Sequence, residues 1–569
     1  KEQFQRALKI GHVDSITVFS KCHHGWAYHP SEANEMHPGL DFDLLGAEIE
    51  AAHEIGVKTP VYLSAGLDEK TARRHPEWLI RNADESLAWT PDFARPGYHR
   101  FCFNTPYLDY LLAQIEEVCE NYDADGIFLD IVAVIPCYCQ TCIRTMRERG
   151  LDPYDPENAY RLAVETYLNY ARRVRETVDK IRPGLPVFQN AGHLEIGNRD
   201  FAHANTHLEL ESLPTGGWGY DHFPLSAAYA RTLGMEYLGM TGKFHRSWGE
   251  FGGFKHPNAL RYEAALSLAN GAKCSIGDQM HPLGFMEEAT YKLIGAAYAE
   301  VEEKEPWCDH VEAVADVAVL AQEAVFHHMH PSECPPGRNS WKGSAGASRI
   351  LLEGKYLFDV VDIEGDFDKY KVIIMTDDSL IDDEIAEKLA AFVRGGGKIL
   401  ASGESALYAD GRGFAFDLGA EYVGKAKFTP SYLRPKFEMN GLWNAPYAIY
   451  EPSSEIRATG VLDLLLGEDK TLTTNLPAQG VVTLMRQEAE HRYVNHLLYA
   501  APVKRGERTE IIEDLIPIYN TEVSLKLYVK PKRVYLAPQM RDIEFDYDDG
   551  VLTYTVDKFE CHQMVVIDY

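Results

Sequence analysis

Short apolar runs alternate with amphipathic helical stretches over the first half of the chain, from Asp14 to Met280. The runs that predict strands are 15–20, 58–64, 126–131, 186–190, 206–212, 236–241 and 272–277. The stretches that predict helices between them include 44–55, 107–122, 158–181 and 258–270. Apolar strands separated by helices are typical of a parallel sheet covered on both faces. Over about 250 residues, the usual closed form of such an α/β fold is the (β/α)8 or TIM barrel.

An open, doubly wound sheet is the alternative to a closed barrel. Polar residues follow nearly every predicted strand, as they do at the C-terminal face of a barrel, and this favours the barrel. Only seven good strands are found, with a short further piece at 100–104. Lys1 to Gly11 has the pattern of an amphipathic helix already under way. The first barrel strand is therefore expected upstream of Lys1.

Two further domains are predicted after a barrel domain that spans 1–310. Residues 311–505 alternate strands at 314–322, 370–376 and 398–402 with helices at 344–359 and 382–395. Three consecutive glycines after the second helix are a C-cap signal. In 506–569 apolar and polar residues alternate, which predicts a small antiparallel β domain.

Composition excludes several classes of partner. A chain of 569 residues is too long for one hydrophobic core. Its net charge of −30 argues against nucleic-acid or membrane-surface binding, which needs a basic face. No run approaches the roughly 18 apolar residues of a membrane span. Ten cysteines in so long a chain are not a disulfide scaffold, and a cytoplasmic location is expected.

Polar and aromatic side chains gather after the predicted strands, where barrel enzymes carry their chemistry. In chain order they are Lys21, His23, His24, Trp26, Asp130, Asn190, His193, Glu209, Glu211, His245, Arg246, Trp248, Glu250, Asp278 and His281. Aromatic rings suit the apolar face of a sugar, and His and Asn suit its hydroxyls. A pair of carboxyl groups suits acid and nucleophile work on a glycosidic bond.

Asp130 is the sharpest single signal. It follows three large apolar residues, and a carboxylate buried there is costly unless it serves a purpose. The alternative is a structural Asp that caps or pairs with a neighbouring strand. As a nucleophile, Asp130 should face the barrel mouth and be kept ionised by hydrogen bonds from Lys21, His23 or His24.

Glu209 and Glu211 share one face of a strand, because side chains alternate with a period of two. Two carboxylates on one face repel, so one of them suits a general acid. The alternative is one ion-paired and one solvated glutamate. Glu250 is the rival acid, in a loop rich in glycine and aromatic residues that could equally be turn chemistry.

Cys137, Cys139 and Cys142 form a C-x-C-x2-C pattern directly after the strand that carries Asp130. Tetrahedral zinc needs a fourth ligand, for which Cys102 is the first choice and Cys119 the second. Packed free thiols or a reversible disulfide are the alternatives. Four thiolates leave no open position, so the zinc would be structural, and no cofactor is expected for catalysis.

The run from Lys21 to Trp26, with its Lys-Cys-His-His start, and the run from Asp125 to Asp130 resemble α-L-fucosidases of glycoside hydrolase families 29 and 151. In those families a Lys-His-His-type motif ends the second barrel strand and the nucleophilic Asp ends the fourth. The block from Glu209 to Phe254, with the run Pro214 to Tyr220, is more similar to family 151. The resemblance implies that Asp130 is the nucleophile.

The cysteine pattern is similar to the zinc site of family 42 β-galactosidases. Those enzymes also carry a glutamine-amidotransferase-like domain that mediates trimerisation, followed by a small β domain. Their nucleophile is a Glu on strand seven, whereas here that strand ends at Gly242 and Lys243 without a carboxylate. The architecture therefore resembles the galactosidases and the chemistry resembles the fucosidases.

These features predict a retaining exo-glycosidase, first of all an α-L-fucosidase, with Asp130 as nucleophile and Glu211, or else Glu250, as acid/base. The residues expected to bind the sugar are His23, His24, Trp26, Asn190, Glu209, Trp218, His245, Trp248 and Asp278. A β-galactoside is the second substrate expected. A carbohydrate-binding or assembly protein on an inactive barrel is the alternative from another class. A homo-oligomer, trimer or dimer, is expected.

Overall fold

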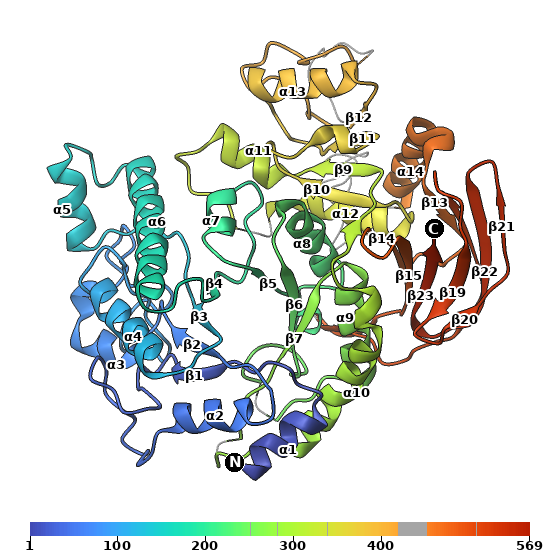
Figure 1. Ribbon diagram of the computed structural model, residues 1–569. Coiled ribbons are helices and arrows are strands. Elements are labelled where there is room, and N and C mark those ends of the chain that lie inside the picture. Colours follow the sequence, from blue (N-terminus) through green and yellow to red (C-terminus); the bar gives the residue numbers. More distant parts are fainter. Residues whose placement is uncertain (251, 282, 338–339, 419–451, 508) are drawn as a thin grey trace.

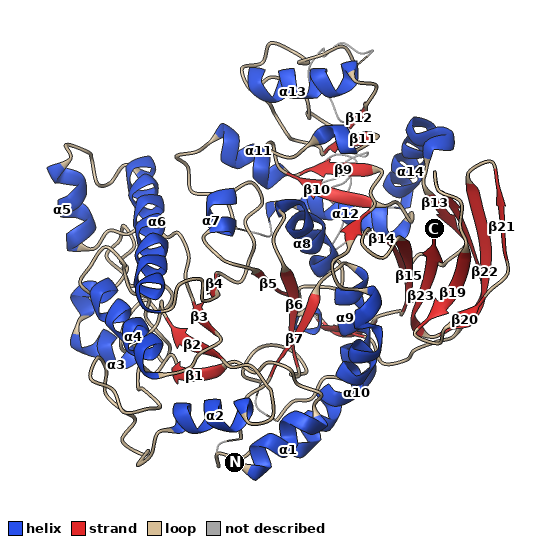
Figure 2. Ribbon diagram, viewed as in Figure 1, coloured by secondary structure: helices blue, strands red, loops and turns tan. Residues whose placement is uncertain are grey.

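The computed structural model describes residues 1–250, 252–281, 283–337, 340–418, 452–507 and 509–569. Strands lie inside the first half of the molecule and helices outside it (Figures 1 and 2). A smaller α/β unit lies above that half in Figure 1, and the C-terminal strands lie to its right. Within the described ranges, no helix has the length and apolarity that crossing a membrane requires.

Parallel strands fill the centre of the first half, in two sheets. The first sheet pairs β1 (Val18–Lys21), β2 (Pro60–Ser64), β3 (Gly126–Asp130) and β4 (Val187–Asn190) in this order. The second pairs β5 (Leu208–Glu211), β6 (Tyr237–Gly242) and β7 (Lys273–Gly277). The predicted parallel α/β fold is confirmed. The short piece predicted at 100–104 makes only isolated bridges, Leu67 with Arg100 and Leu79 with Phe101.

Helices cover the outer faces of these sheets (Figure 2). They are α1 (Glu2–Ile10), α2 (Leu44–His53), α3 (Glu69–Arg74), α4 (Tyr107–Asn121), α5 (Gln140–Glu148), α6 (Pro156–Ile181), α7 (Arg199–His203), α8 (His222–Ala230), α9 (Pro257–Ala269) and α10 (Glu288–Lys304). The long helix α6 begins two residues before the predicted start at 158, because Pro156 needs no backbone partner and the Asp155 side chain accepts from Glu157 N.

Alternation along each strand decides what faces inward. In β3, Ile127 and Leu129 pack outward in the core that contains Leu111 of α4, so Phe128 and Asp130 face inward. The inward-facing rings of Tyr62, Phe128 and Phe188 form one buried cluster with Met240 of the second sheet. The two sheets therefore share an interior, and side chains at their strand ends face a common space.

The middle α/β unit contains a parallel sheet in the order β10-β9-β11-β12. Its elements are β9 (Val317–Leu320), α11 (Gln322–Met329), α12 (Lys342–Glu353), β10 (Phe358–Val361), β11 (Val372–Met375), α13 (Asp383–Arg394) and β12 (Lys398–Ala401). The helix predicted at 344–359 is too long, because its last residues start β10. Phe358 to Val361 are buried on both faces and pair with β9, which overrides the helical pattern.

Ion pairs join this middle unit to the first half. Arg199, which begins α7, makes two hydrogen bonds of 2.8 and 2.9 Å to Asp362, directly after β10. Arg231 bonds Asp359 at 2.5 Å. Asp362 is 1% exposed, so each arginine pairs with a carboxylate that has little access to water. These contacts hold the end of β10 against α7 and against the residue that follows α8.

The C-terminal part is antiparallel, as the alternating pattern predicts for 506–569, but β8 and the strands from 472 to 499 in these sheets lie within 311–505, for which the sequence predicts an α/β domain. One sheet has the order β20-β19-β23-β15-β14-β8 and another the order β13-β18-β22-β21, while β16 and β17 form a hairpin. Helix α14 (Pro452–Leu466) precedes most of them. The strands are β8 (Glu312–Ala313), β13 (Leu472–Thr474), β14 (Gly480–Gln487), β15 (Arg492–Tyr499), β16 (Val503–Gly506), β17 (Thr509–Ile511), β18 (Ile518–Lys526), β19 (Arg533–Ala537), β20 (Arg541–Asp542), β21 (Phe545–Asp548), β22 (Val551–Phe559) and β23 (Cys561–Asp568).

A buried histidine pair on β15 and β23 makes the stability of this part depend on pH. His496 Nδ1 lies 3.0 Å from His562 Nε2, and the rings stack with centroids 5.2 Å apart. Burial, helped by the charge of Lys304, lowers the pKa of His496 to about 3 and the pKa of His562 well below its ordinary value. Both rings therefore stay neutral in the folded protein, whereas in the unfolded chain they bind protons near pH 6.5.

We expect the free energy of unfolding to be highest above pH 6.5 and to fall as the pH drops below it. Each imidazole should contribute about 1.4 kcal/mol per pH unit, because only the unfolded state takes up the proton. Urea unfolding at pH 7, 6 and 5 measures the free energy of unfolding. In a double variant, His496→Leu and His562→Leu, this free energy should fall less steeply with falling pH than in the wild type. His310→Gln, at a ring 85% exposed, is the control. Equal slopes in wild type and double variant would contradict the prediction.

Candidate active site

Asp130 ends β3 at the inner face, and three groups hold its carboxylate. Tyr62 Oη on the adjacent strand donates to Oδ2 at 2.5 Å. Asn190 Nδ2, at the end of β4, donates to Oδ1 at 3.0 Å, and the backbone N of Ile131 donates to the same oxygen at 2.9 Å. Every one of these bonds stabilises the ionised form of the carboxyl group.

Asn190 also joins Asp130 to Glu211. The same Nδ2 atom lies 3.2 Å from Glu211 Oε2 at the end of β5, on the second sheet. Since each hydrogen bond spans about 3 Å, the two carboxylate oxygens lie no more than roughly 6 Å apart. Two of the predicted catalytic residues and one predicted sugar-binding residue thus meet at the inner ends of three strands.

The other oxygen of Glu211 is bound by an indole. Trp248 Nε1 donates to Glu211 Oε1 at 2.6 Å. The ring lies over the ends of β6 and β7, where a Cβ at Gly277 would be 2.2 Å from Trp248 Cζ3 and a Cβ at Gly242 would be 3.2 Å from the same atom. Glycine at these two strand ends is what lets the indole approach the backbone and reach Glu211.

The backbone is strained beside Asp130. Ile131 has a φ of 62°, a left-handed conformation that is rare for a β-branched residue. Its carbonyl oxygen would be 1.9 Å from a Cβ at residue 66, so Gly66 is needed there. Strain of this kind persists only where surrounding contacts impose it, and it is common at active sites.

The prediction that Lys21 holds Asp130 is wrong. Lys21 is fully buried and its Nζ lies 3.3 Å from Asp68 Oδ2, which is also fully buried. A lysine so deeply buried needs the nearest available carboxylate, and the loop that follows β2 brings Asp68 to it. His23 Nδ1 lies 2.7 Å from Ser64 Oγ. Burial lowers the pKa of His23, and the charge of Asp130 opposes that effect.

Other predicted sugar-binding residues surround this centre. Glu209 lies two positions below Glu211 on the same strand face, with His207 Nε2 3.1 Å from its carboxylate. The exposed His24 lies 5.6 Å from Tyr98 between ring centroids, and Trp26 packs under Lys70 Nζ at 4.9 Å. Trp218 packs edge-on against His222, at 4.9 Å between centroids, and His222 Nδ1 is 3.2 Å from Ser212 Oγ at the end of β5.

Three predicted residues make contacts away from Asp130. Glu250 Oε2 accepts from Arg246 N at 2.6 Å, so its carboxylate closes its own loop. His245 lies near enough to Glu513 to help lower the pKa of that carboxyl, whose main cause is Arg505. Burial raises the pKa of Asp278, which lies 3.9 Å from Lys243 Nζ.

Two residues near the centre were missed. In the sequence, Tyr62 has the pattern of an ordinary apolar strand residue. Its place two residues before Ser64, the last residue of β2, is the one signal that could have indicated an inward-facing hydroxyl. Arg100 lies with Gly66 and Ile131 beside a small cavity, and its guanidinium lies 4.7 Å from the ring of Trp89. Burial lowers the pKa of Arg100 to about 10, against the opposing charge of Asp130. In the part of the chain that is described, Arg100 Nε is buried without a hydrogen-bond partner.

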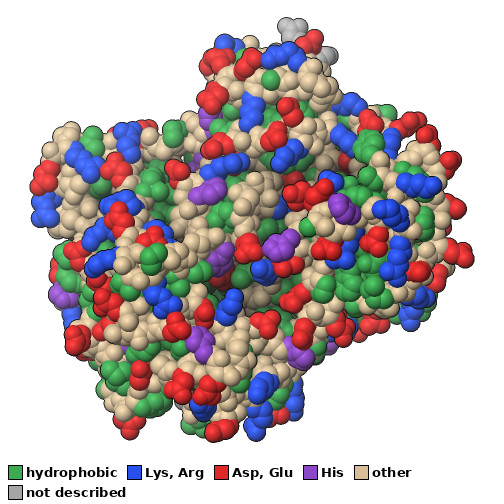
Figure 3. Space-filling model, in the orientation of Figure 1, with side chains coloured by type: hydrophobic (Ala, Val, Ile, Leu, Met, Phe, Trp, Pro, Cys, Tyr) green, Lys and Arg blue, Asp and Glu red, His purple; other side chains and the backbone are tan. Residues whose placement is uncertain are grey.

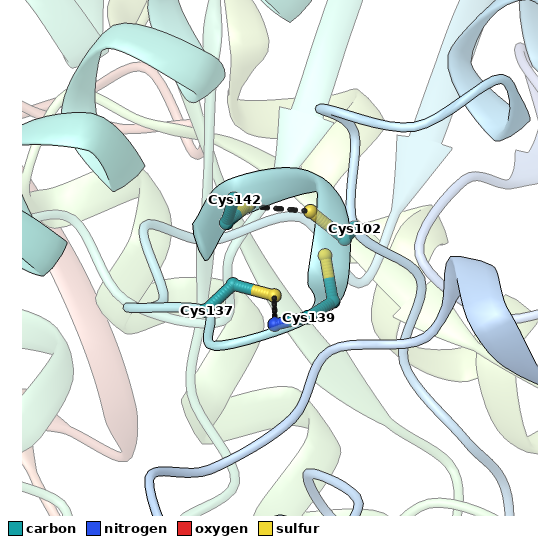
Figure 4. A group of neighbouring side chains, drawn as sticks. All are labelled: Cys102, Cys137, Cys139 and Cys142. Atoms are coloured by element: carbon teal, nitrogen blue, oxygen red, sulfur yellow. Dashed lines mark hydrogen bonds between the residues drawn. The ribbon is translucent and has the colours of Figure 1, made fainter. Parts of the chain in front are cut away.

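Four cysteines lie together behind β3. Cys102, Cys137, Cys139 and Cys142 are all buried, and their sulfurs lie within 4.8 Å of one another. Figure 4 shows the four sulfurs turned toward a common centre. Cys102 is the fourth member, because Cys119 packs with apolar side chains of the core around α4. Four converging thiols form a donor set that can hold one metal ion and that suits tetrahedral zinc.

The surface above the strand ends is hollowed. Figure 3 shows a depression near the centre of this face, with acidic and histidine side chains around it. Positive and negative side chains are mixed over the rest of the face, with no broad basic patch. A hollow with carboxylates and imidazoles around it suits a neutral polar ligand such as a sugar.

The solved structures that this chain is similar to include glycosidases. Residues 1–131 match the family model described as hypothetical glycosyl hydrolase 6. The solved structure of α-L-fucosidase isoenzyme 2 from Paenibacillus thiaminolyticus is 50% identical, with a TM-score of 0.94, and the match covers 100% of this chain and 96% of that one. A search of curated proteins gave no match.

The likeness to family 42 enzymes is one of fold alone. Gan42B, a β-galactosidase from G. stearothermophilus, matches with a TM-score of 0.71 at 14% identity, over 100% of this chain and 96% of that one. The β-galactosidase from Bacillus circulans sp. alkalophilus gives a TM-score of 0.69, also at 14% identity, with the same coverage. The resemblance to α-L-fucosidases is confirmed by the 50% identity, and the resemblance to family 42 is confirmed in the fold. With half its residues identical over the full length, this chain belongs to the glycoside hydrolase family of the Paenibacillus α-L-fucosidase.

Proposed function

We propose that this glycoside hydrolase is an α-L-fucosidase that retains the anomeric configuration. Asp130 would attack the anomeric carbon, and Glu211 would protonate the departing oxygen and then activate water. The observation that carries the proposal is the single Asn190 nitrogen that bonds both carboxylates. A retaining pair needs about 5–5.5 Å between its carboxyl groups, whereas an inverting pair needs about 6.5–9.5 Å to admit a water molecule.

The choice of Glu211 over Glu250 rests on contacts. Glu211 is bonded from both sides, by Asn190 and by Trp248, in line with Asp130. One carboxylate oxygen of Glu250 accepts a hydrogen bond from Arg246 N in its own loop. The choice of a fucoside over a galactoside rests on the 50% identity to the Paenibacillus enzyme and on strand β6, which ends at Gly242 without a carboxylate.

The test is hydrolysis of 4-nitrophenyl α-L-fucoside and 4-nitrophenyl β-D-galactoside, each against a heat-killed control. Release from the fucoside alone supports the proposal, and nuclear magnetic resonance of the first sugar product should show the α anomer. Release from the galactoside alone contradicts it. A thermal shift with free fucose, but no turnover of either compound, would support a binding protein on an inactive barrel instead.

Replacing Glu211 by alanine should lower kcat/KM by about 10²- to 10⁴-fold on a fucoside with a poor leaving group. The loss should be much smaller on 4-nitrophenyl α-L-fucoside, since nitrophenolate needs little protonation to depart. Glu250→Ala is the matched control and should change neither rate by more than a few-fold. If Glu250→Ala shows the leaving-group dependence and Glu211→Ala does not, the acid role belongs to Glu250.

We further propose that β1 to β7 belong to a closed TIM barrel. The interior cluster of Tyr62, Phe128, Phe188 and Met240 supports closure, as does the hydrogen bond from Thr206 N to Val187 O, 3.0 Å long, at the junction of β4 and β5. The barrel domain would span 1–310, the α/β domain 311–505 and the C-terminal β domain 506–569, with β14 and β15 pairing into the sheet of the last. Structural zinc at the four cysteines and a homo-oligomer complete the proposal.

A further inference from the structure

A crevice opens beside Glu211. Strands β4 and β5 belong to different sheets, and a cavity of about 60 Å³ lies between their ends. Its lining includes Asn190 and Glu211 at the strand ends, and His193 and Glu195 from the loop after β4. The cavity has room for a few water molecules or a hydroxyl-bearing group, and it begins at the acid.

His193 is held in this crevice by the middle α/β unit. Its Nε2 lies 3.1 and 3.3 Å from the two carboxylate oxygens of Glu323, which belongs to the first turn of α11. Glu323 is only 4% exposed, so its charge needs this partner. A proton on Nε2 leaves Nδ1 as an acceptor, and among the described residues that buried Nδ1 has no hydrogen-bond partner.

The position of His193 relative to Glu211 indicates which part of a substrate it would meet. Gly192, with a φ of +72°, brings the loop after β4 close to Glu211. A Cβ at this position would be 3.8 Å from Glu211 Oε2. An acid that protonates the departing oxygen lies against the leaving group and not against the attacked sugar. The residue after Gly192 therefore lies on the leaving-group side.

A second group in the crevice can donate to a hydroxyl-bearing ligand. Burial and the neighbouring charge of Glu323 raise the pKa of Glu195 to about 7, so a large share of this carboxyl carries a proton at neutral pH. Asn198 Nδ2 lies 3.3 Å from Glu195 Oε2 and fixes its orientation. An acceptor at His193 and a donor at Glu195 are the pair that a sugar hydroxyl needs.

We propose that His193 accepts a hydrogen bond from a hydroxyl of the leaving group, and that Glu323 of the middle unit is the residue that positions it. The inference rests on the proposed function and adds its substrate class: fucosides whose leaving group is a second sugar. It also assigns the middle unit a part in substrate selection, since α11 lies outside the barrel strands.

The experiment compares an α-L-fucosyl disaccharide with 4-nitrophenyl α-L-fucoside, whose leaving group has no hydroxyl to offer. His193→Ala and Glu323→Ala should each lower kcat/KM for the disaccharide about tenfold, the equivalent of one hydrogen bond, mainly through KM. In both variants, kcat/KM for the aryl fucoside should stay within about twofold of the wild-type value. Glu323→Gln keeps an acceptor oxygen, so its kcat/KM for the disaccharide should lie between those of the wild type and of Glu323→Ala.

The same helix offers a matched control. His328 of α11 pairs with Asp382 at 2.8 Å, and neither residue lines the crevice. Asp382→Asn removes that charge in the same surroundings and should leave kcat/KM unchanged for both substrates. Melting temperatures of all variants, with assays well below them, separate loss of folding from loss of selectivity.

The outcomes separate this inference from the proposed function. Equal losses on both substrates, or no loss on the disaccharide, would overturn the role of His193. A wild-type enzyme that hydrolyses the aryl fucoside but no fucosyl disaccharide would overturn the substrate class. A wild-type enzyme inert on both compounds would instead refute the fucosidase assignment itself.

Discussion

Replacing Asp130 by glycine is expected to lower kcat by about 10⁴-fold or more, because the group that forms the covalent intermediate is gone. Sodium azide should restore part of the activity on 4-nitrophenyl α-L-fucoside. The small anion fits the space left by the carboxylate, and with Glu211 unchanged it attacks the same face of the sugar. The product should be β-L-fucosyl azide, with its anomeric configuration inverted relative to the substrate.

Asp125 provides the control, since it lies just before the same strand at the opposite end. Its carboxylate pairs with His53 at 2.8 Å and accepts from Thr59 N at 2.7 Å, so its role is structural. Asp125→Asn should keep kcat and lower the melting temperature. An Asp130→Gly enzyme with wild-type rates would show that Asp130 is a structural residue too, and azide with no effect on a dead variant would argue against covalent catalysis.

Loss of the zinc that we propose at the cysteine cluster is expected to destabilise the loops behind β3. Four thiolate ligands around structural zinc can contribute about 10 kcal/mol or more to folding. Cys142→Ser should therefore abolish binding of one zinc ion per chain, measured by plasma mass spectrometry of the purified protein. It should also lower the unfolding midpoint by on the order of 10 °C. Activity should fall as well, because Cys137 lies in the loop that leaves Asp130.

Cys119→Ser is the matched control, at a thiol that is equally buried but outside the cluster. It should retain the metal and lose only the stability that a buried polar substitution costs, about 1–3 kcal/mol. A wild-type protein that holds no metal after expression with added zinc, together with a Cys142→Ser variant of unchanged midpoint, would support packed free thiols instead.

Much of the fold could be predicted from the sequence, because apolar periodicity is a local property. The strands that carry Lys21, Asp130, Asn190 and Glu211 lie where the apolar runs place them. The pattern failed at the start of β10, since the predicted helix 344–359 included Phe358 and Asp359. Their pairing with β9, a contact between residues about 40 apart, decided the outcome.

The set of candidate residues was also readable, since polar residues at the ends of parallel strands must share one edge. Their partners were not. Lys21 follows its strand as predicted, yet it pairs with Asp68, whose carboxylate is also fully buried and lies 3.3 Å away. The indole that donates to Glu211 belongs to Trp248, and two glycines at the ends of β6 and β7 make room for it.

The sequence by itself determined the kind of fold, the position of Asp130 at a strand end and the cysteine pattern, because these depend on residues within a few positions of one another. Only the tertiary structure decided that Asn190 bonds both Asp130 and Glu211, that Cys102 completes the thiol cluster, and that Glu323 holds His193 from another unit. These contacts depend on strand order and on loops that cross between sheets. No periodicity along the chain encodes which distant side chains such packing brings within hydrogen-bond distance.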